Sequence, residues 1–231
     1  MFDLLEDEKS KIVLGSILNS KITLDNSHLN TIASLPSEQY FDDELFTLTD
    51  EEIFCDCGSF NGDTLKQFLH KSNRKYKKYF AIEADPSNYN ELLKTIEKEK
   101  SIHIYPINKA CWSEKTVLKF NPLSSAGTIN IGGSLQIQAD SLDNLLTEES
   151  ITFIKMDIEG AEQKALFGAK KIIEKNSPIM AICLYHSLED YFKIPLMINK
   201  MNPEYKLYIR HYTARVDVET VCYAIPNSRL K

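Results

Sequence analysis

The hydrophobic positions along this chain change their spacing near residue 50. Before that point the sequence is mostly polar, with apolar residues at helical spacing at 11–15 and again at 29–35. From Ile53 onward, short apolar runs alternate with amphipathic stretches of helical periodicity. We therefore predict an N-terminal helical extension over residues 1–50 and one larger domain over residues 51–231.

The apolar runs predict strands, and the amphipathic stretches predict the helices between them. Strands are expected at 53–56, 79–83, 103–107, 116–120, 134–138, 152–157, 178–185, 205–211 and 220–225. Helices are expected at 63–71, 86–98, 141–146, 161–175 and 188–201. The strands at 116–120 and 134–138 should pair antiparallel around a loop rich in Gly, Ser and Asn.

The order of these elements indicates the fold class. Strands that alternate with helices are typical of βαβ units and of a mainly parallel sheet. The run PIMAICLY at 178–185 has almost no polar residue, as expected of a strand buried on both faces. The last two strands are joined by a loop too short for a crossover helix, so they must pair antiparallel. The sequence predicts an α/β, Rossmann-like doubly wound domain with an antiparallel edge strand.

Charge and cysteine usage narrow the function classes. The net charge of −6 and the isoelectric point near 5.5 argue against a nucleic-acid partner. The acidic start MFDLLEDEKS does not resemble a secretion signal, and no apolar run approaches the ~18 residues of a membrane span. Five scattered cysteines fit a reducing cytoplasm, and Cys55 and Cys57 should share one buried strand face. We expect a cytoplasmic protein without an integral membrane segment.

The stretch FCDCGSFNGDT at 54–64 follows the first strand of the larger domain, where open parallel sheets bind ligands. Its glycines, Gly58 and Gly62, do not have the G-x-G-x-x-G spacing of dinucleotide-binding loops, and the G-K-[ST] of a phosphate loop is missing. Asp56 and Asp63 flank the loop and would repel a pyrophosphate. A neutral or cationic nucleoside suits the loop better.

Glu83 ends the second strand about 20 residues later, the position from which a carboxylate accepts hydrogen bonds from ribose hydroxyls. A glycine loop of this kind, followed by an acid at the end of the second strand, is typical of nucleoside recognition without a diphosphate. S-adenosyl-L-methionine, a nucleoside carrying a sulfonium and an amino acid, is such a ligand.

A second group of charged residues is KMDIEGAE at 155–162. Asp157 ends a strand, and Lys155 lies on the same strand face. Glu159 and Glu162 begin the following helix, where they either cap it or serve the site. Lys155 is alternatively an ion-pair partner within the sheet. His186 ends the next strand, where an imidazole suits the role of general base. Asp157, Glu159 and His186 could together hold a divalent ion, but the spacing does not require one and we predict no metal.

With these motifs, the chain resembles the FkbM family of S-adenosylmethionine-dependent methyltransferases. The resemblance runs from Tyr40 to about Pro226. It rests on FCDCGSFNGDT, FAIEADP at 80–86, INKACW at 107–112, ADSLDNLL at 139–146 and above all FIKMDIEGAEQKALFGA at 153–169. The chain departs from many relatives by carrying Ser59, instead of alanine, after Gly58. The resemblance implies a class I methyltransferase fold with a seven-stranded, mainly parallel sheet.

The resemblance also implies roles for individual residues. The expected donor site comprises Asp56, Gly58, Ser59, Asn61, Gly62, Asp63, Glu83, Ala84, Asn108, Lys109, Ala110, Asp140 and Tyr40. Tyr40 would act as part of a lid, unless it packs in the core. The expected catalytic residues are Asp157 and His186, which would orient or deprotonate an acceptor, with Lys155 and Glu159 in support.

The acceptor expected from the resemblance is a hydroxyl of a sugar, a glycan or another small molecule, such as a cell-surface polysaccharide or a secondary metabolite. The sequence does not determine the oligomeric state, and a homodimer is one possibility. Two alternatives compete with this function: an NAD-dependent oxidoreductase, and a non-catalytic binding protein built on the same fold.

Overall fold

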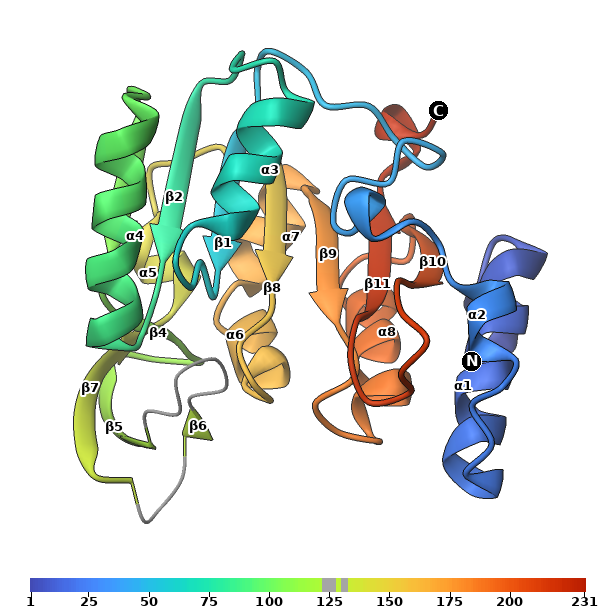
Figure 1. The fold of residues 1–231 in the computed structure, drawn as a ribbon. Helices are drawn as coiled ribbons and strands as arrows, with labels where there is room; N and C mark the ends of the chain where they lie inside the picture. The colour runs from blue at the N-terminus through green and yellow to red at the C-terminus, as the bar shows by residue number, and fades with distance from the viewer. Residues whose placement is uncertain (122–127, 130–132) are drawn as a thin grey trace. The chain divides into compact units, whose positions relative to one another are not determined.

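The computed structural model describes residues 1–121, 128–129 and 133–231, with the backbone alone described at 128–129. Part of the loop rich in Gly, Ser and Asn therefore lies outside the described residues. The chain forms two compact units (Figure 1). The central unit comprises Leu48–Pro178, and the terminal unit comprises Met1–Thr47 together with Ile179–Lys231.

A parallel sheet forms the core of the central unit, with the strand order β8-β1-β2-β3. Its strands are β1 (Ile53–Cys57), β2 (Lys78–Ile82), β3 (Ile104–Ile107) and β8 (Phe153–Met156). The helices around it are α3 (Asp63–Lys71), α4 (Pro86–Glu99), α6 (Glu162–Phe167) and α7 (Lys170–Asn176). In Figure 1, α3 lies in front of these strands and α7 behind them.

One face of this sheet carries a layer of aromatic rings. Phe54 of β1 packs between Tyr79 of β2 and Phe153 of β8, with ring centroids 5.0 and 4.8 Å away. Phe68 covers them from α3, 4.9 Å from the Phe54 ring. Successive residues of a strand alternate between the two faces, so residue 56 of β1 also lies on the α3 side. These rings come from the amino-terminal halves of their strands, and the layer excludes water from that part of the face.

The opposite face of β1 carries two cysteines. Cys55 and Cys57 are fully buried, and their sulfur atoms lie 3.7 Å apart. The prediction that they share one buried face is confirmed.

The central unit also contains a smaller sheet with the strand order β4-β7-β5-β6. Its strands are β4 (Ala110–Cys111), β5 (Thr116–Asn121), β6 (Thr128–Ile129) and β7 (Leu135–Asp140), and the short helix α5 (Leu142–Leu145) follows. The predicted antiparallel pairing of the segments at 116–120 and 134–138 is confirmed by β5 and β7. The two-residue strands β4 and β6 are too short to produce a periodic signal, so the sequence did not predict them.

The single helix predicted over 161–175 is wrong, because the chain forms two helices there, α6 and α7. The break falls at Gly168 and Ala169. A Cβ atom at Gly168 would lie 2.0 Å from the carbonyl oxygen of Trp112, so the backbone approaches the neighbouring segment too closely for any other residue. This contact between distant segments is not visible as a change in periodicity.

The terminal unit contains an antiparallel group of three strands with the order β9-β11-β10. They are β9 (Ile179–Cys183), β10 (Lys206–His211) and β11 (Thr220–Ile225). The helices are α1 (Glu8–Thr23), α2 (Leu29–Ile32) and α8 (Asp190–Met201), and 3-10 turns lie at Phe2–Leu4, Pro36–Glu38 and Asn227–Arg229. All five residues of β9 are buried, as predicted from the unbroken apolar run.

The N-terminal helix α1 is joined to β10 by a buried ionic contact. Arg210 is only 2% exposed, and its guanidinium donates to the Asp7 carboxylate at 2.7 Å and to the Ser10 hydroxyl at 2.9 Å. Asp7 also caps α1 by accepting from the Ser10 amide at 2.8 Å. The predicted helical extension thus packs against the C-terminal strands.

The predicted fold class is confirmed. Among the described residues the main sheet has seven strands, β1, β2, β3, β8, β9, β10 and β11. It is mostly parallel, and β11 runs antiparallel to both of its partners. Within the described ranges, no helix combines the length and the apolar character that a bilayer crossing requires.

Candidate functional site

The loop after β1 is held against the ends of two neighbouring strands. The amides of Gly58 and Ser59 both donate to the carbonyl of Ile82, at 2.9 and 3.1 Å. Gly58 has a φ of +82°, and a Cβ atom there would lie 1.9 Å from the carbonyl oxygen of Asp157. Only glycine can therefore occupy this position without moving the chain. Gly62, with a φ of +86°, caps the N-terminus of α3.

Glu83 lies at the end of β2, beside this loop, and is 7% exposed. Its carboxylate accepts from two backbone amides, those of Phe60 and Asp85, both at 2.8 Å. Burial raises the pKa of Glu83 to about 7, although the two amides and the charge of Lys155 act in the opposite direction. Each carboxylate oxygen keeps a second acceptor position, so the group can still bind two hydroxyl donors.

The other predicted residues of the loop have mainly structural contacts. The Ser59 hydroxyl donates to the Asp56 carbonyl at 3.0 Å, and the Asn61 carbonyl accepts from Thr95 at 2.7 Å. Asp63 is exposed, and its carboxylate accepts from the Thr64 amide at 2.7 Å in the first turn of α3. These contacts fix the path of the loop between β1 and α3.

Four predicted residues surround the start of the smaller sheet. The Asn108 side chain donates to the Glu83 carbonyl at 2.8 Å, and Ala110 is buried in β4. Lys109 and Asp140 form an ion pair at 3.1 Å. Burial acts to raise the pKa of Asp140, but hydrogen bonds from Asn144, Lys109 and the Ser141 amide outweigh it and hold that pKa below its usual value. Asp140 is therefore an ionised group that links β4 to β7.

An apolar surface continues from Ala84, the residue after Glu83. Ala84, Trp112 and Leu118 are half-buried and pack on a buried cluster formed by Ala110, Phe120, Ile137 and Ala139. The residues predicted for the nucleoside are thus brought together within the central unit.

Asp56 and Lys155 form a buried ion pair. The Lys155 ammonium lies 3.1 Å from one Asp56 carboxylate oxygen and donates to the Gly58 carbonyl at 2.7 Å. The other Asp56 oxygen accepts from the Tyr79 hydroxyl at 2.6 Å. Because Asp56 has no exposed surface, its carboxylate acts on the loop through these contacts. The sequence did not single out Tyr79, although it lies on the same sheet face as Asp56.

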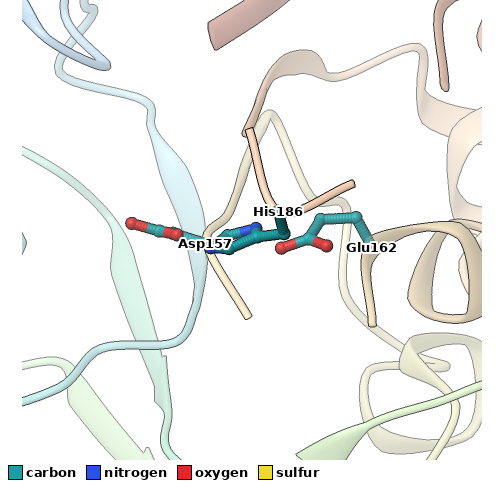
Figure 2. A group of neighbouring side chains, drawn as sticks. All are labelled: Asp157, Glu162 and His186. Carbon is teal, nitrogen blue, oxygen red and sulfur yellow. The ribbon is translucent and has the colours of Figure 1, made fainter. Parts of the chain in front are cut away.

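The motif after β8 places two carboxyl groups close together (Figure 2). Asp157 and Glu162 have carboxylate oxygens within 4.8 Å of each other. Glu162 is fully buried and accepts from the Ile158 amide at 2.8 Å, so it closes the turn that precedes α6. Glu159 occupies the left-handed region with a φ of +56°, followed by Gly160 at +92°. Asp157 is half-buried and lies at the carboxyl end of β8, as predicted.

The terminal unit contains the two remaining predicted residues. His186, also drawn in Figure 2, is half-buried and follows β9, with its ring 4.2 Å from that of Tyr185. Tyr40 is 7% exposed; its amide donates to the Tyr223 hydroxyl at 2.9 Å, and its hydroxyl lies 3.7 Å from the sulfur of Cys183. These contacts favour the packing role for Tyr40 over the lid.

Comparison with known proteins gives a family and a fold. The family model described as the methyltransferase FkbM domain matches residues 56–216. The structure of the methyltransferase FkbM from Methylobacillus flagellatus KT superposes with a TM-score of 0.85 at 25% identity, over 96% of this chain. The matched region is 56% of that structure's chain, so this chain spans little more than half its length.

A second structure supports the fold alone. An rRNA methylase from Streptococcus thermophilus superposes with a TM-score of 0.53 at 13% identity, over 80% of this chain and 90% of its own. No curated protein matches the sequence of this chain.

Proposed function

Because the chain belongs to the FkbM methyltransferase family, we propose that it binds S-adenosyl-L-methionine and methylates a hydroxyl group of a sugar or another small molecule. The observation that carries the donor assignment is Glu83, a buried carboxylate with free acceptor positions beside a glycine loop. The acceptor class rests on the family resemblance. The five cysteines all lie within the described residues, are buried and form no disulfide there, which supports a reducing compartment such as the cytoplasm.

The residues present fit this donor in three respects. Glu83 would accept from the ribose hydroxyls, and the apolar surface that begins at Ala84 and Trp112 would lie against the adenine. The carboxylates of Asp157 and Glu159 follow β8 and suit a cationic sulfonium. When bound, S-adenosylmethionine supplies an activated methyl group.

The remaining task of the protein is to align an acceptor oxygen and to remove its proton. Alignment converts a bimolecular displacement into an effectively unimolecular one and so lowers the barrier. Proton removal requires a base within hydrogen-bond reach of the hydroxyl. We propose Asp157 or His186 for this step, and both follow strands at the ends where open α/β sheets bind ligands.

The donor assignment is tested by thermal unfolding of the full chain with S-adenosylmethionine, S-adenosylhomocysteine and NAD in parallel. We expect the first two to raise the melting temperature and NAD to leave it unchanged, since the loop has no dinucleotide fingerprint. Stabilisation by NAD alone would favour an oxidoreductase. Mass spectrometry of candidate sugars after incubation with the donor then tests transfer, and donor binding without any methylated product would favour a non-catalytic binding protein.

Donor affinity should depend on pH through Glu83. Its pKa of about 7 means that the carboxylate, the form that accepts from two hydroxyls, is lost as pH falls from 8 to 6. We expect the affinity for S-adenosylhomocysteine to fall by roughly tenfold across this range and to level off above pH 8. Titration calorimetry at several pH values measures it. Glu83→Gln, which cannot ionise, should remove this dependence.

His186→Ala should lower the turnover number while sparing donor affinity. The variant removes a group that can accept a hydroxyl proton, a contribution typically of 10²–10⁴-fold. Turnover is followed by S-adenosylhomocysteine release and affinity by calorimetry. A wild-type rate in the variant would remove His186 from the mechanism and leave Asp157 as the proposed base.

A further inference from the structure

Lys155 is a buried cation at the edge of the donor loop. Its side chain is 3% exposed, and its ammonium contacts the Asp56 carboxylate at 3.1 Å and the Gly58 carbonyl at 2.7 Å. A buried ion pair loses much of its attraction to the cost of removing two charges from water, so its contribution to stability is small. The presence of the buried Lys155 cation is therefore better explained by its effect on the groups around it than by a gain in stability.

The surroundings of the pair keep this charge from being screened. The rings of Phe54, Tyr79 and Phe153 lie on the same sheet face, and the Tyr79 hydroxyl donates to Asp56 at 2.6 Å. Water is therefore excluded on that side. In such a medium a charge acts over a longer range than at the surface.

The first neighbour of Lys155 is the backbone of Gly58. The Gly58 amide donates to the Ile82 carbonyl at 2.9 Å, and its Cα lies against the Asp157 carbonyl. Lys155 holds the remaining polar group, the Gly58 carbonyl, at 2.7 Å. The three contacts together fix the orientation of the peptide that begins the loop.

The charge of Lys155 also acts on Glu83. The positive charge of Lys155 lowers the pKa of this carboxyl, against the larger opposite effect of burial. Lys155 thus favours the charged form of the group that would bind the ribose.

We propose that Lys155 is a positioning residue for the methyl donor, which fixes the Gly58 carbonyl without itself contacting the donor. This inference rests on the proposed function. It differs from a role in proton transfer, because an ammonium that is held by Asp56 and Gly58 is already engaged as a donor. It also differs from a purely structural role, because it makes donor binding depend on the charge at residue 155.

The test compares two variants of the full chain that share one change, Asp56→Asn and the double variant Asp56→Asn/Lys155→Met. Both lack the buried carboxylate; Asp56→Asn keeps the Lys155 cation without its partner and the double variant removes that cation, so the melting temperature of each is recorded beside its affinity. The probe is S-adenosylhomocysteine, titrated by calorimetry from pH 6 to pH 9. We expect the double variant to bind at least tenfold more weakly at pH 7, and the pH at which its affinity is half-maximal to lie higher than in Asp56→Asn.

Arg210→Met serves as the matched control, since it removes another buried cation that belongs to the terminal unit. It should lower the melting temperature and leave the pH midpoint of donor binding at the wild-type value. Equal affinities and equal midpoints in the two Asp56 variants would overturn the positioning role while wild-type binding still supports the proposed function. Absence of binding by the wild-type chain would overturn both. If the double variant does not fold, Asp56→Asn/Lys155→Gln gives the same comparison.

Discussion

Replacing Glu83 by alanine should weaken binding of S-adenosylmethionine by at least tenfold at pH 8, where the wild-type carboxyl is ionised. Hydrogen bonds to a charged acceptor contribute about 1.5–3 kcal/mol each, and one tenfold step in affinity corresponds to about 1.4 kcal/mol. The loss of even one ribose contact is therefore enough. Titration calorimetry gives the affinity directly. Unchanged affinity in the variant would contradict the proposal that Glu83 binds the ribose hydroxyls.

Glu83→Ala also leaves the backbone amides of Phe60 and Asp85 without their acceptor, so loss of stability must be separated from loss of binding. Glu83→Gln removes the charge and keeps one acceptor oxygen, but its NH2 group faces one of the two amides, so its melting temperature is recorded beside its affinity. Glu52→Gln is the matched control at the opposite end of β1, where a fully buried carboxylate accepts from the Thr49 amide at 2.9 Å. We expect this variant to lose stability and to bind the donor with wild-type affinity.

Gly58→Ala should be among the most destabilising single substitutions in the central unit. The new Cβ would lie 1.9 Å from the Asp157 carbonyl oxygen, and the residue would have to keep a φ of +82°. Left-handed backbone costs about 1–2 kcal/mol for a residue with a side chain, and overpacking adds about 1–3 kcal/mol. We expect a loss of about 3 kcal/mol in the free energy of unfolding, measured by urea denaturation.

Gly15→Ala provides the internal comparison. Gly15 lies within α1, and a Cβ atom there would have no neighbour within 4 Å. Alanine is the better helix former, so this substitution should stabilise the chain by up to about 1 kcal/mol. A similar loss of stability in both variants would show that the close approach at Gly58 is not what makes its glycine necessary.

The sequence predicted the parallel strands and the position of Glu83 because both depend on local patterns. A short, mostly apolar run predicts β1 and β2, and an acid that follows such a run, as Glu83 follows β2, lies at the edge of the sheet. The break at Gly168 and the contact of Tyr79 with Asp56 could not be found this way. Both depend on which distant segments become neighbours, and periodicity does not contain that information.

The contacts of Lys155 could be predicted only in part from the sequence. Side chains alternate between the two faces of a strand, so the sequence places Lys155 on the same face as Asp157. The sequence allows two roles for Lys155, an ion-pair partner within the sheet or a residue that supports catalysis. Pairing with Asp56 needed the register between β1 and β8, in which residues 56 and 155 are partners. Register follows from the packing of whole strands, so the sequence left the choice open.

The smaller sheet provides an intrinsic optical probe. Trp112 is the only tryptophan of the chain, and it packs on the apolar cluster beside Ala84 with the Lys164 ammonium 6.0 Å from its ring centroid. Indole fluorescence responds to the polarity and charge around the ring. Selective excitation of this indole in the unlabelled protein therefore reports on this one surface, and emission recorded during stopped-flow mixing with S-adenosylmethionine would test whether the proposed adenine site lies there.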